Sequence, residues 1–176
     1  MRRVLLLDDE PNVLNALQRT LRQCFAGEDL RIELFADPEP ALVRCGEMAF
    51  DVIVSDYRMP GMNGVDFLEA IKGIQPDAVR LVLSASTEFN AIMSAVNRAE
   101  VFRYIAKPWQ ADDLKKNFTL AFERRDQTRE ERRLADESRI KRGELTPQEM
   151  EVRRLEAEEP GITKVNWGED GAVHLD

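Results

Sequence analysis

Five polar residues of this sequence each come at or just after the end of a short apolar run, and together they offer carboxylate, hydroxyl and ammonium groups. They are Asp8, Asp9, Asp56, Ser84 and Lys107. Three carboxylates that meet in one place repel one another unless a cation lies between them. Their oxygen atoms suit Mg²⁺ or Mn²⁺, and they suit zinc poorly without nitrogen or sulfur ligands. Because Mg²⁺ tends to share its coordination shell with phosphate, the set predicts phosphoryl chemistry at a divalent cation.

Asp56 is the residue that we expect to react. An aspartate carboxylate can act as a nucleophile and form an acyl phosphate. The cation and the Lys107 ammonium group would then neutralise the charge on the transferring phosphoryl oxygens. The Ser84 hydroxyl would donate a hydrogen bond to one of those oxygens.

Each of these residues also has a purely structural explanation. The acids at 8–10 could cap a helix, Ser84 could form a turn, and Lys107 could be a solvated lysine. Their joint placement at the ends of four of five apolar runs favours a shared site.

The elements that position these residues alternate between strand and helix patterns. Strands are predicted at 4–7, 30–35, 52–54, 78–83 and 101–106, the second of them as an edge strand. Helical spacing follows the strands at 12–25, 37–48, 65–72 and 89–99, and resumes after residue 109. This alternation predicts an α/β fold with a five-stranded parallel, doubly wound sheet. Such sheets bind ligands at the carboxyl ends of their strands, which is where the five polar residues fall.

Composition and sequence pattern argue against several other classes of function. The chain has 176 residues and a net charge of -8, which argues against a chain-wide nucleic-acid surface. No apolar run approaches the roughly 20 residues of a membrane span, and no apolar leader follows Met1, so we expect a cytoplasmic protein without a membrane partner. Cys24 and Cys45 lack metal-ligand spacing and His174 has no visible partner, so neither a zinc site nor a histidine triad is expected.

The chain resembles the receiver domain of bacterial two-component response regulators, of the chemotaxis type, in four segments: LLLDDEPNVL, VIVSDYRMPGMNGVDFL, LVLSAS and FRYIAKPW. The resemblance covers Val4 to about Phe122. It implies a flavodoxin-like receiver fold. It also implies that Asp56 receives a phosphoryl group, with Mg²⁺, from the phosphohistidine of a histidine kinase or a phosphotransfer protein.

The resemblance assigns a metal-binding role to four positions. Asp9 resembles the direct ligand of Mg²⁺ and Asp8 the ligand that acts through water. Asp56 and the backbone carbonyl of Arg58 would complete the protein's share of the coordination shell.

It assigns a switching role to two residues and a phosphate-binding role to a third. Ser84 resembles the switch hydroxyl, Tyr104 the switch aromatic residue and Lys107 the phosphate-binding lysine. Phosphorylation adds roughly two negative charges at the aspartate, so Ser84 would move in to donate a hydrogen bond and leave space for Tyr104. The change would bias a surface formed by the helix at 89–99, the last strand and the following helix, and a downstream protein effector would bind there.

Three segments are expected: a receiver domain at 1–123, a helical extension or linker at 124–145, and a tail at 146–176 that holds a short helix and a β-hairpin. The capping box at 146–149 starts the short helix, and the residues at 168–171 form the hairpin turn. The extension interleaves arginines with acids, which predicts a salt-bridged helix, the continuation of a long last helix, rather than a nucleic-acid site. The tail is of no recognised type and does not identify the output.

The preferred function is a phosphorylation-controlled switch that signals through protein contacts, with a homodimer as one arrangement. We expect no enzyme activity beyond slow autodephosphorylation. A DNA-binding transcriptional regulator is the first alternative, and the acidic helix at 148–159 argues against DNA as a partner. An aspartyl-phosphate phosphatase is the second. Phosphatases of the haloacid-dehalogenase type carry DxD after the first strand, whereas here Asp8 and Asp9 are adjacent.

Overall fold

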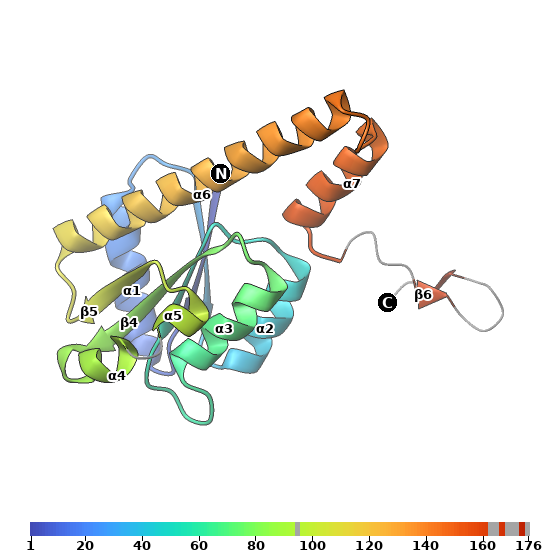
Figure 1. Ribbon diagram of the computed structural model, residues 1–176. Helices are drawn as coiled ribbons and strands as arrows, with labels where there is room; N and C mark the ends of the chain where they lie inside the picture. Colours follow the sequence, from blue (N-terminus) through green and yellow to red (C-terminus); the bar gives the residue numbers. More distant parts are fainter. Residues whose placement is uncertain (94–95, 162–165, 168–172, 175–176) are drawn as a thin grey trace.

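Parallel strands form the centre of the molecule, in the order β2-β1-β3-β4-β5 (Figure 1). Their bounds are β1 Arg2–Leu7, β2 Leu30–Phe35, β3 Val52–Asp56, β4 Val79–Ala85 and β5 Arg103–Lys107. The computed structural model describes residues 1–93, 96–161, 166–167 and 173–174. All five predicted strands are present and β2 lies at an edge, so the predicted doubly wound α/β fold is confirmed.

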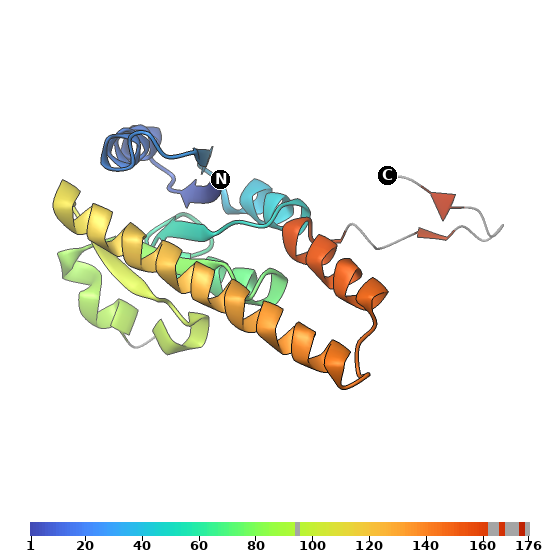
Figure 2. The same ribbon diagram turned by 90° about the horizontal axis from the view of Figure 1, so that it is seen from above.

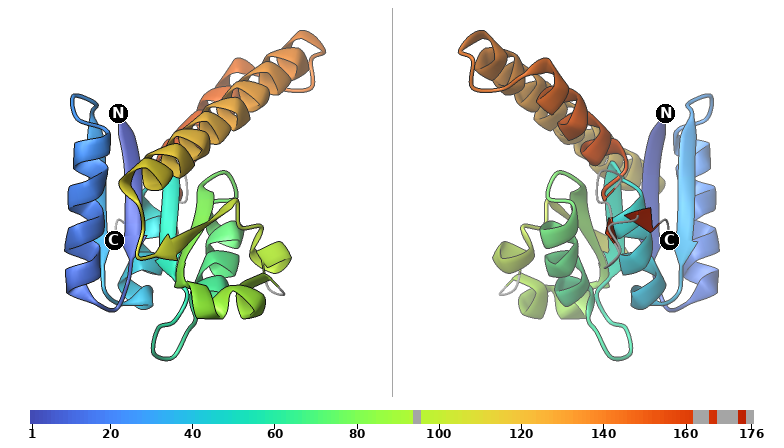
Figure 3. Two further views of the ribbon diagram at one scale, coloured as in Figure 1. Left: turned by 90° about the vertical axis from the view of Figure 1, so that its left-hand side faces the viewer. Right: turned by 90° about the vertical axis from the view of Figure 1, so that its right-hand side faces the viewer.

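Helices cover both faces of the sheet (Figures 2 and 3). They are α1 Pro11–Cys24, α2 Pro38–Glu47, α3 Gly64–Ile74, α4 Phe89–Met93, α5 Val96–Ala99, α6 Ala111–Lys141 and α7 Pro147–Glu158. Successive side chains of a strand point to opposite faces. Val4 and Leu6 therefore pack in the core with α1 and α6, whereas Leu5 and Leu7 pack in the core with α2 and α3. Because both faces are covered, the inner strands are continuous apolar runs.

Several elements differ from their predicted bounds. Helix α3 runs past Gly73 to Ile74, so Gly73 does not end it. Strand β4 extends to Ala85 and includes Ser84, which was expected to follow the strand. The helix predicted at 89–99 is described as the two short helices α4 and α5, and residues 94–95 between them lie outside the described residues.

Helix α6 continues without a break from the sheet into the C-terminal extension. It spans 31 residues and ends just before Gly143, whose φ of +74° is one that glycine adopts at little cost. The predicted capping box of Thr146 and Glu149 is formed and starts α7. This helix runs back toward the sheet (Figure 1), where the Ala49 N–H donates to the carbonyl at the end of α7 at 3.2 Å.

Buried ion pairs at the amino ends of the strands fix α6 to the sheet. Asp51, which directly precedes β3, accepts a hydrogen bond from the Arg3 N–H at 2.8 Å. The same carboxylate lies 3.4 Å from Arg125 Nε and 3.2 Å from an Arg129 nitrogen. These contacts reach an acid outside the extension and were not predicted, whereas Arg133 pairs with Glu130 and Glu137 of the same helix, as the interleaved charges predict.

Two short strands end the described part of the chain, β6 Asn166–Trp167 and β7 Val173–His174. They pair antiparallel, as a hairpin requires, and the predicted turn at 168–171 lies outside the described residues. Within the described ranges, no helix has both the length and the apolar character needed to cross a bilayer.

Candidate functional site

The carboxyl ends of β1, β3 and β5 meet at one edge of the sheet. Asp8 and Asp9 directly follow β1, Asp56 is the last residue of β3, and Lys107 is the last residue of β5. Because these strands are parallel members of one sheet, residues from distant parts of the sequence arrive at the same edge.

Lys107 joins two of the acids directly. Its Nζ lies 2.8 Å from Asp56 Oδ1 and 2.9 Å from Asp8 Oδ2. Carboxylate oxygens of Asp8, Asp9 and Asp56 all lie within 4.8 Å of one another. Asp8 and Asp56 are 1% and 5% exposed, whereas Asp9 is exposed. The structure thus brings four of the predicted site residues together.

Asp8 also shapes the chain entry into α1. Its Oδ1 accepts the Glu10 N–H at 2.9 Å while its other oxygen holds Lys107. Glu10, the residue before the helix, makes no side-chain cap. The Asp8 carboxylate therefore makes a local contact at the entry to α1 and a long-range contact with Lys107.

The electrostatics of the cluster favour an added cation. Burial and the neighbouring charge of Asp8 raise the pKa of Asp56 to about 6, although the hydrogen bond from Lys107 lowers it. Burial alone would lower the pKa of Lys107, but the hydrogen bonds to Asp56 and Asp8 raise it overall. Three carboxylates face one ammonium group, so negative charge is in excess. An all-oxygen donor set with surplus negative charge fits Mg²⁺ or Mn²⁺.

The loop after Asp56 returns closely to the strand end at Gly64. The Gly64 N–H donates to the Tyr57 carbonyl at 2.7 Å. A Cβ at this position would lie 2.1 Å from the Asp56 carbonyl oxygen, closer than any side chain allows. Glycine is therefore required here for the loop to hold the end of β3 in place.

Ser84 and Tyr104 lie beside the cluster on β4 and β5. Among the described residues, the Ser84 hydroxyl donates to the Glu88 carboxylate and lies 3.2 Å from the Ala85 carbonyl oxygen, rather than bonding to Asp56. The Tyr104 hydroxyl donates to the carbonyl oxygens of Ser84 and Ala85, each at 3.1 Å. The two predicted switch residues are therefore joined through the end of β4.

Glu88 is a site residue that the sequence did not reveal. Its carboxylate accepts from Ser84 and pairs with Arg58, whose Nε lies 2.6 Å away. An acid just before a helix is commonly explained by the helix dipole, so its type and position gave no signal of this contact. The Arg58 side chain forms an ion pair with Glu88. The metal-binding role of the Arg58 carbonyl stays a prediction.

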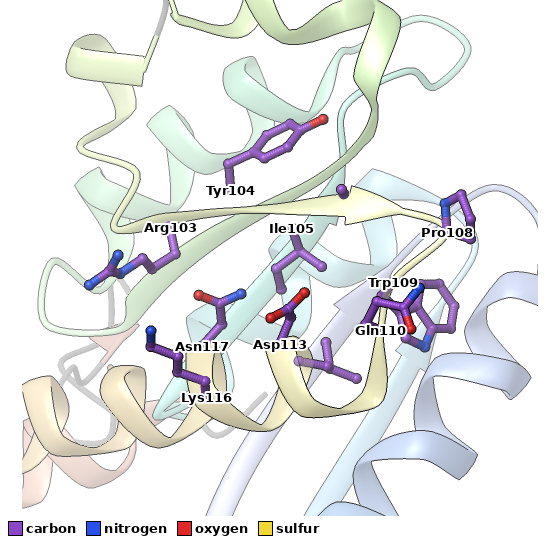
Figure 4. A pocket seen from close by; sticks show the side chains of 11 residues that line it. Arg103, Tyr104, Ile105, Pro108, Trp109, Gln110, Asp113, Lys116 and Asn117 are labelled. Carbon is purple, nitrogen blue, oxygen red and sulfur yellow. The ribbon is translucent and has the colours of Figure 1, made fainter.

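A separate hollow of about 370 Å³ lies between β5 and the first turns of α6 (Figure 4). Ile105, Trp109, Asp113 and Asn117 are among the residues that line it. The Tyr104 ring lies on the other side of β5 in this view. None of the clustered acids lines this hollow, so it is distinct from the acidic cluster.

Comparison with known proteins agrees with this geometry. The family described as the response regulator receiver domain matches residues 4–119. The hydrogenase transcriptional regulatory protein HoxA of Cupriavidus necator is 37% identical over 111 residues, which are 63% of this chain and 22% of that protein. The chain thus spans about a fifth of the length of the curated relatives that it matches.

Solved structures show the same fold. The crystal structure of adenylate cyclase from Rhodopirellula baltica has a TM-score of 0.69 at 31% identity, over 76% of this chain and 96% of that chain. The signal receiver domain of an HD domain-containing protein from Pseudomonas fluorescens Pf-5 has a TM-score of 0.65 at 27% identity, over 73% and 92%. With a family match over residues 4–119 and the flavodoxin-like sheet that carries the acidic cluster, this chain belongs to the response regulator receiver domain family.

Proposed function

We propose that this chain is a two-component response regulator that is phosphorylated on Asp56 and signals through protein contacts. The observation that carries the proposal is one lysine that binds two buried aspartates, with a third aspartate in the same cluster. The phosphoryl donor would be the phosphohistidine of a histidine kinase or of a phosphotransfer protein, as membership of the family implies.

In this proposal the ionised carboxylate of Asp56 is the nucleophile. One of its oxygens attacks phosphorus, so that a P–O bond forms while the P–N bond of the phosphohistidine breaks. The imidazole leaves with the electron pair of that bond and takes up a proton. Lys107, 2.8 Å from the carboxylate, orients it and then stabilises the negative charge on the phosphoryl oxygens.

The donor set fits Mg²⁺ or Mn²⁺ as the cofactor. Asp9, Asp56 and the backbone carbonyl of Arg58 would hold the cation directly, and Asp8 would hold it through water. When bound, the cation supplies positive charge opposite the phosphoryl oxygens. Asp8 has a further task of its own, because it fixes Lys107 at 2.9 Å and the start of α1 at the same time.

Ser84 and Tyr104 would carry the signal away from Asp56. The Ser84 hydroxyl would turn toward a phosphoryl oxygen, which loosens the end of β4 to which the Tyr104 hydroxyl donates. The affected surface is made by α4, β5 and the start of α6, and a downstream protein effector would bind it.

The proposed division of the chain places the receiver domain at 1–123, a helical connector at 124–145 and a tail at 146–176. Binding of the effector or of a second copy would involve the connector and tail, which extend the receiver fold. In this proposal the chain acts in the cytoplasm and is not an enzyme beyond slow autodephosphorylation, which also sets aside an aspartyl-phosphate phosphatase.

DNA binding is the second candidate, because the name of HoxA describes a transcriptional regulator. The match covers 22% of that protein, and α7 is rich in glutamate, which suits DNA poorly. A mobility shift with random duplex DNA at low salt tests this candidate, and we expect no shift.

Acetyl phosphate with Mg²⁺ tests the main proposal. Intact-mass measurement should show one added phosphoryl group on the wild-type chain and on Asp29→Asn, a matched variant at an exposed acid outside the cluster. Asp56→Asn should show none. Labelling that persists in Asp56→Asn would refute the proposed nucleophile.

A further inference from the structure

We propose that Glu88 is a positioning residue that holds the Ser84 hydroxyl in the unphosphorylated protein and competes with the phosphoryl group for it. The inference rests on the proposed function of Asp56 and adds a residue that sets how readily this site switches.

The Ser84 hydroxyl donates to the Glu88 carboxylate. Ser84 is 0% exposed, and the Glu88 side chain is 10% exposed, so water has little access to either partner. A serine hydroxyl has a single proton to donate. The Glu88 carboxylate, the Ala85 carbonyl oxygen 3.2 Å away and a phosphoryl oxygen on Asp56 are therefore alternative acceptors. Ser84 must give up the charged carboxylate to bind the phosphoryl oxygen.

A second group keeps Glu88 in this place. Arg58 Nε lies 2.6 Å from Glu88 Oε1, and the Arg58 side chain is 79% exposed while its partner is nearly buried. Arg58 belongs to the loop that follows Asp56, so the Glu88 carboxylate connects that loop to the end of β4. A phosphoryl group would add roughly two negative charges near this carboxylate, and like charges repel.

Movement of Glu88 away from Ser84 would change the position of residues on the switch surface. Glu88 immediately precedes α4, and Phe89, the first residue of α4, packs edge-to-face on the Tyr104 ring with centroids 5.7 Å apart. The Tyr104 hydroxyl in turn donates to the Ser84 carbonyl. Glu88 therefore lies between the hydroxyl that senses the phosphoryl group and the aromatic pair on the output surface.

Beryllofluoride with Mg²⁺, a non-covalent substitute for the phosphoryl group, provides the test on the full chain. Hydrogen–deuterium exchange in peptides that cover residues 84–93 reports the switch at each beryllofluoride concentration. For Glu88→Ala we expect the half-maximal concentration to fall by about tenfold, because Ser84 no longer has to leave a charged acceptor. Glu88→Gln keeps a neutral acceptor, so its half-maximal concentration should lie between those of Glu88→Ala and the wild type. Glu69→Ala, which removes one of the two ion-pair partners of Arg98, should match the wild type.

The double-mutant cycle with Ser84→Ala separates positioning from general loosening of α4. If Glu88 acts through the hydroxyl, Glu88→Ala has no further effect in the Ser84→Ala background. An unchanged half-maximal concentration in both Glu88 variants, or an equal fall with and without Ser84, would overturn the inference and leave Asp56 as the phosphoacceptor. A wild-type chain that neither responds to beryllofluoride nor takes up a phosphoryl group from acetyl phosphate would overturn the proposed function together with it.

Discussion

Two buried aspartates stand at the two ends of β3, and their surroundings differ. Asp51 directly precedes the strand and is 3% exposed, and Asp56 ends it and is 5% exposed. Asp51 accepts a backbone N–H and faces two arginines of α6. Asp56 faces one lysine, which it shares with Asp8, and lies beside a third acid.

The difference teaches that burial alone does not mark a functional carboxylate. At the amino end of the strand, the two arginines and the backbone N–H compensate the negative charge of Asp51. Its carboxylate therefore connects β1, β3 and α6. At the carboxyl end the negative charge is in excess, which leaves the site open to a cation and a phosphoryl group. Charge balance, considered together with burial, therefore distinguishes the structural end of β3 from the end that we propose to be reactive.

The largest expected effect is the difference in the free energy of unfolding between Asp51→Asn and Asp56→Asn. Asp51→Asn should lower the free energy of unfolding by about 3 kcal/mol, because it leaves the Arg125 guanidinium buried without a counter-charge. Asp56→Asn should leave the stability unchanged or raise it, because burial disfavours this carboxylate in its ionised form, as its raised pKa indicates. Urea unfolding of both variants without divalent cations measures the difference.

An equal loss of stability in Asp56→Asn and Asp51→Asn would contradict this expected difference between the two ends of β3. Acetyl phosphate labelling supplies the complementary readout, because folded Asp51→Asn should still accept a phosphoryl group while Asp56→Asn should not. Loss of labelling in folded Asp51→Asn would show that the two ends of β3 are not independent.

Cation binding should stabilise the folded protein only through the acids at the carboxyl end of β3. Mg²⁺ at about 100 times its Kd should raise the free energy of unfolding of the wild-type chain by about 2.7 kcal/mol. Asp56→Asn should gain much less, and Asp29→Asn should gain as much as the wild type. Chemical unfolding with and without Mg²⁺ measures these gains, and an equal gain in all three chains would place the cation elsewhere.

We expect Lys107 to compete with the cation, because it pairs with the carboxylates of Asp8 and Asp56. Removing its ammonium group in Lys107→Ala should tighten Mg²⁺ binding by about tenfold, which corresponds to roughly 1.4 kcal/mol of lost charge repulsion. Isothermal titration calorimetry measures the Kd. Weaker binding in the variant would mean that Lys107 supports the cation site rather than opposing it.

The smallest effect is expected at an exposed ion pair of the amino end. Arg132 Nε lies 2.5 Å from Asp77 Oδ2, but the Arg132 side chain is 60% exposed. Because solvent screens such pairs, Arg132→Ala should lower the free energy of unfolding by less than about 1 kcal/mol. A cost in urea unfolding as large as that of Asp51→Asn would show that exposed pairs, rather than the buried carboxylate, fix α6.

The sequence was sufficient to predict the sheet and most of the cluster. Apolar runs that end on acids or lysine predict buried parallel strands, and parallel strands bring their carboxyl ends together, so the contact of Lys107 with Asp56 follows from topology. The capping box at Thr146 was also predictable, because its residues are neighbours in the sequence.

Contacts between distant side chains were not predictable in the same way. Asp51 and Arg125 are 74 residues apart, and no local pattern distinguishes Arg125 from the exposed arginines around it. Glu88 likewise looks like an ordinary acid before a helix. Helix α3 continues through Gly73 because its apolar face, which includes Phe67 and Ile71, is buried, and this burial outweighs the low helix propensity of glycine.

Anomalous scattering from Mn²⁺ in crystals of the full chain would locate the cation. We expect one strong peak at the carboxyl end of β3, within bonding distance of the Asp9 and Asp56 carboxylates, and no peak at Asp51. A peak at Asp51, or none at the Asp56 cluster at a Mn²⁺ concentration that saturates binding in solution, would contradict this expectation.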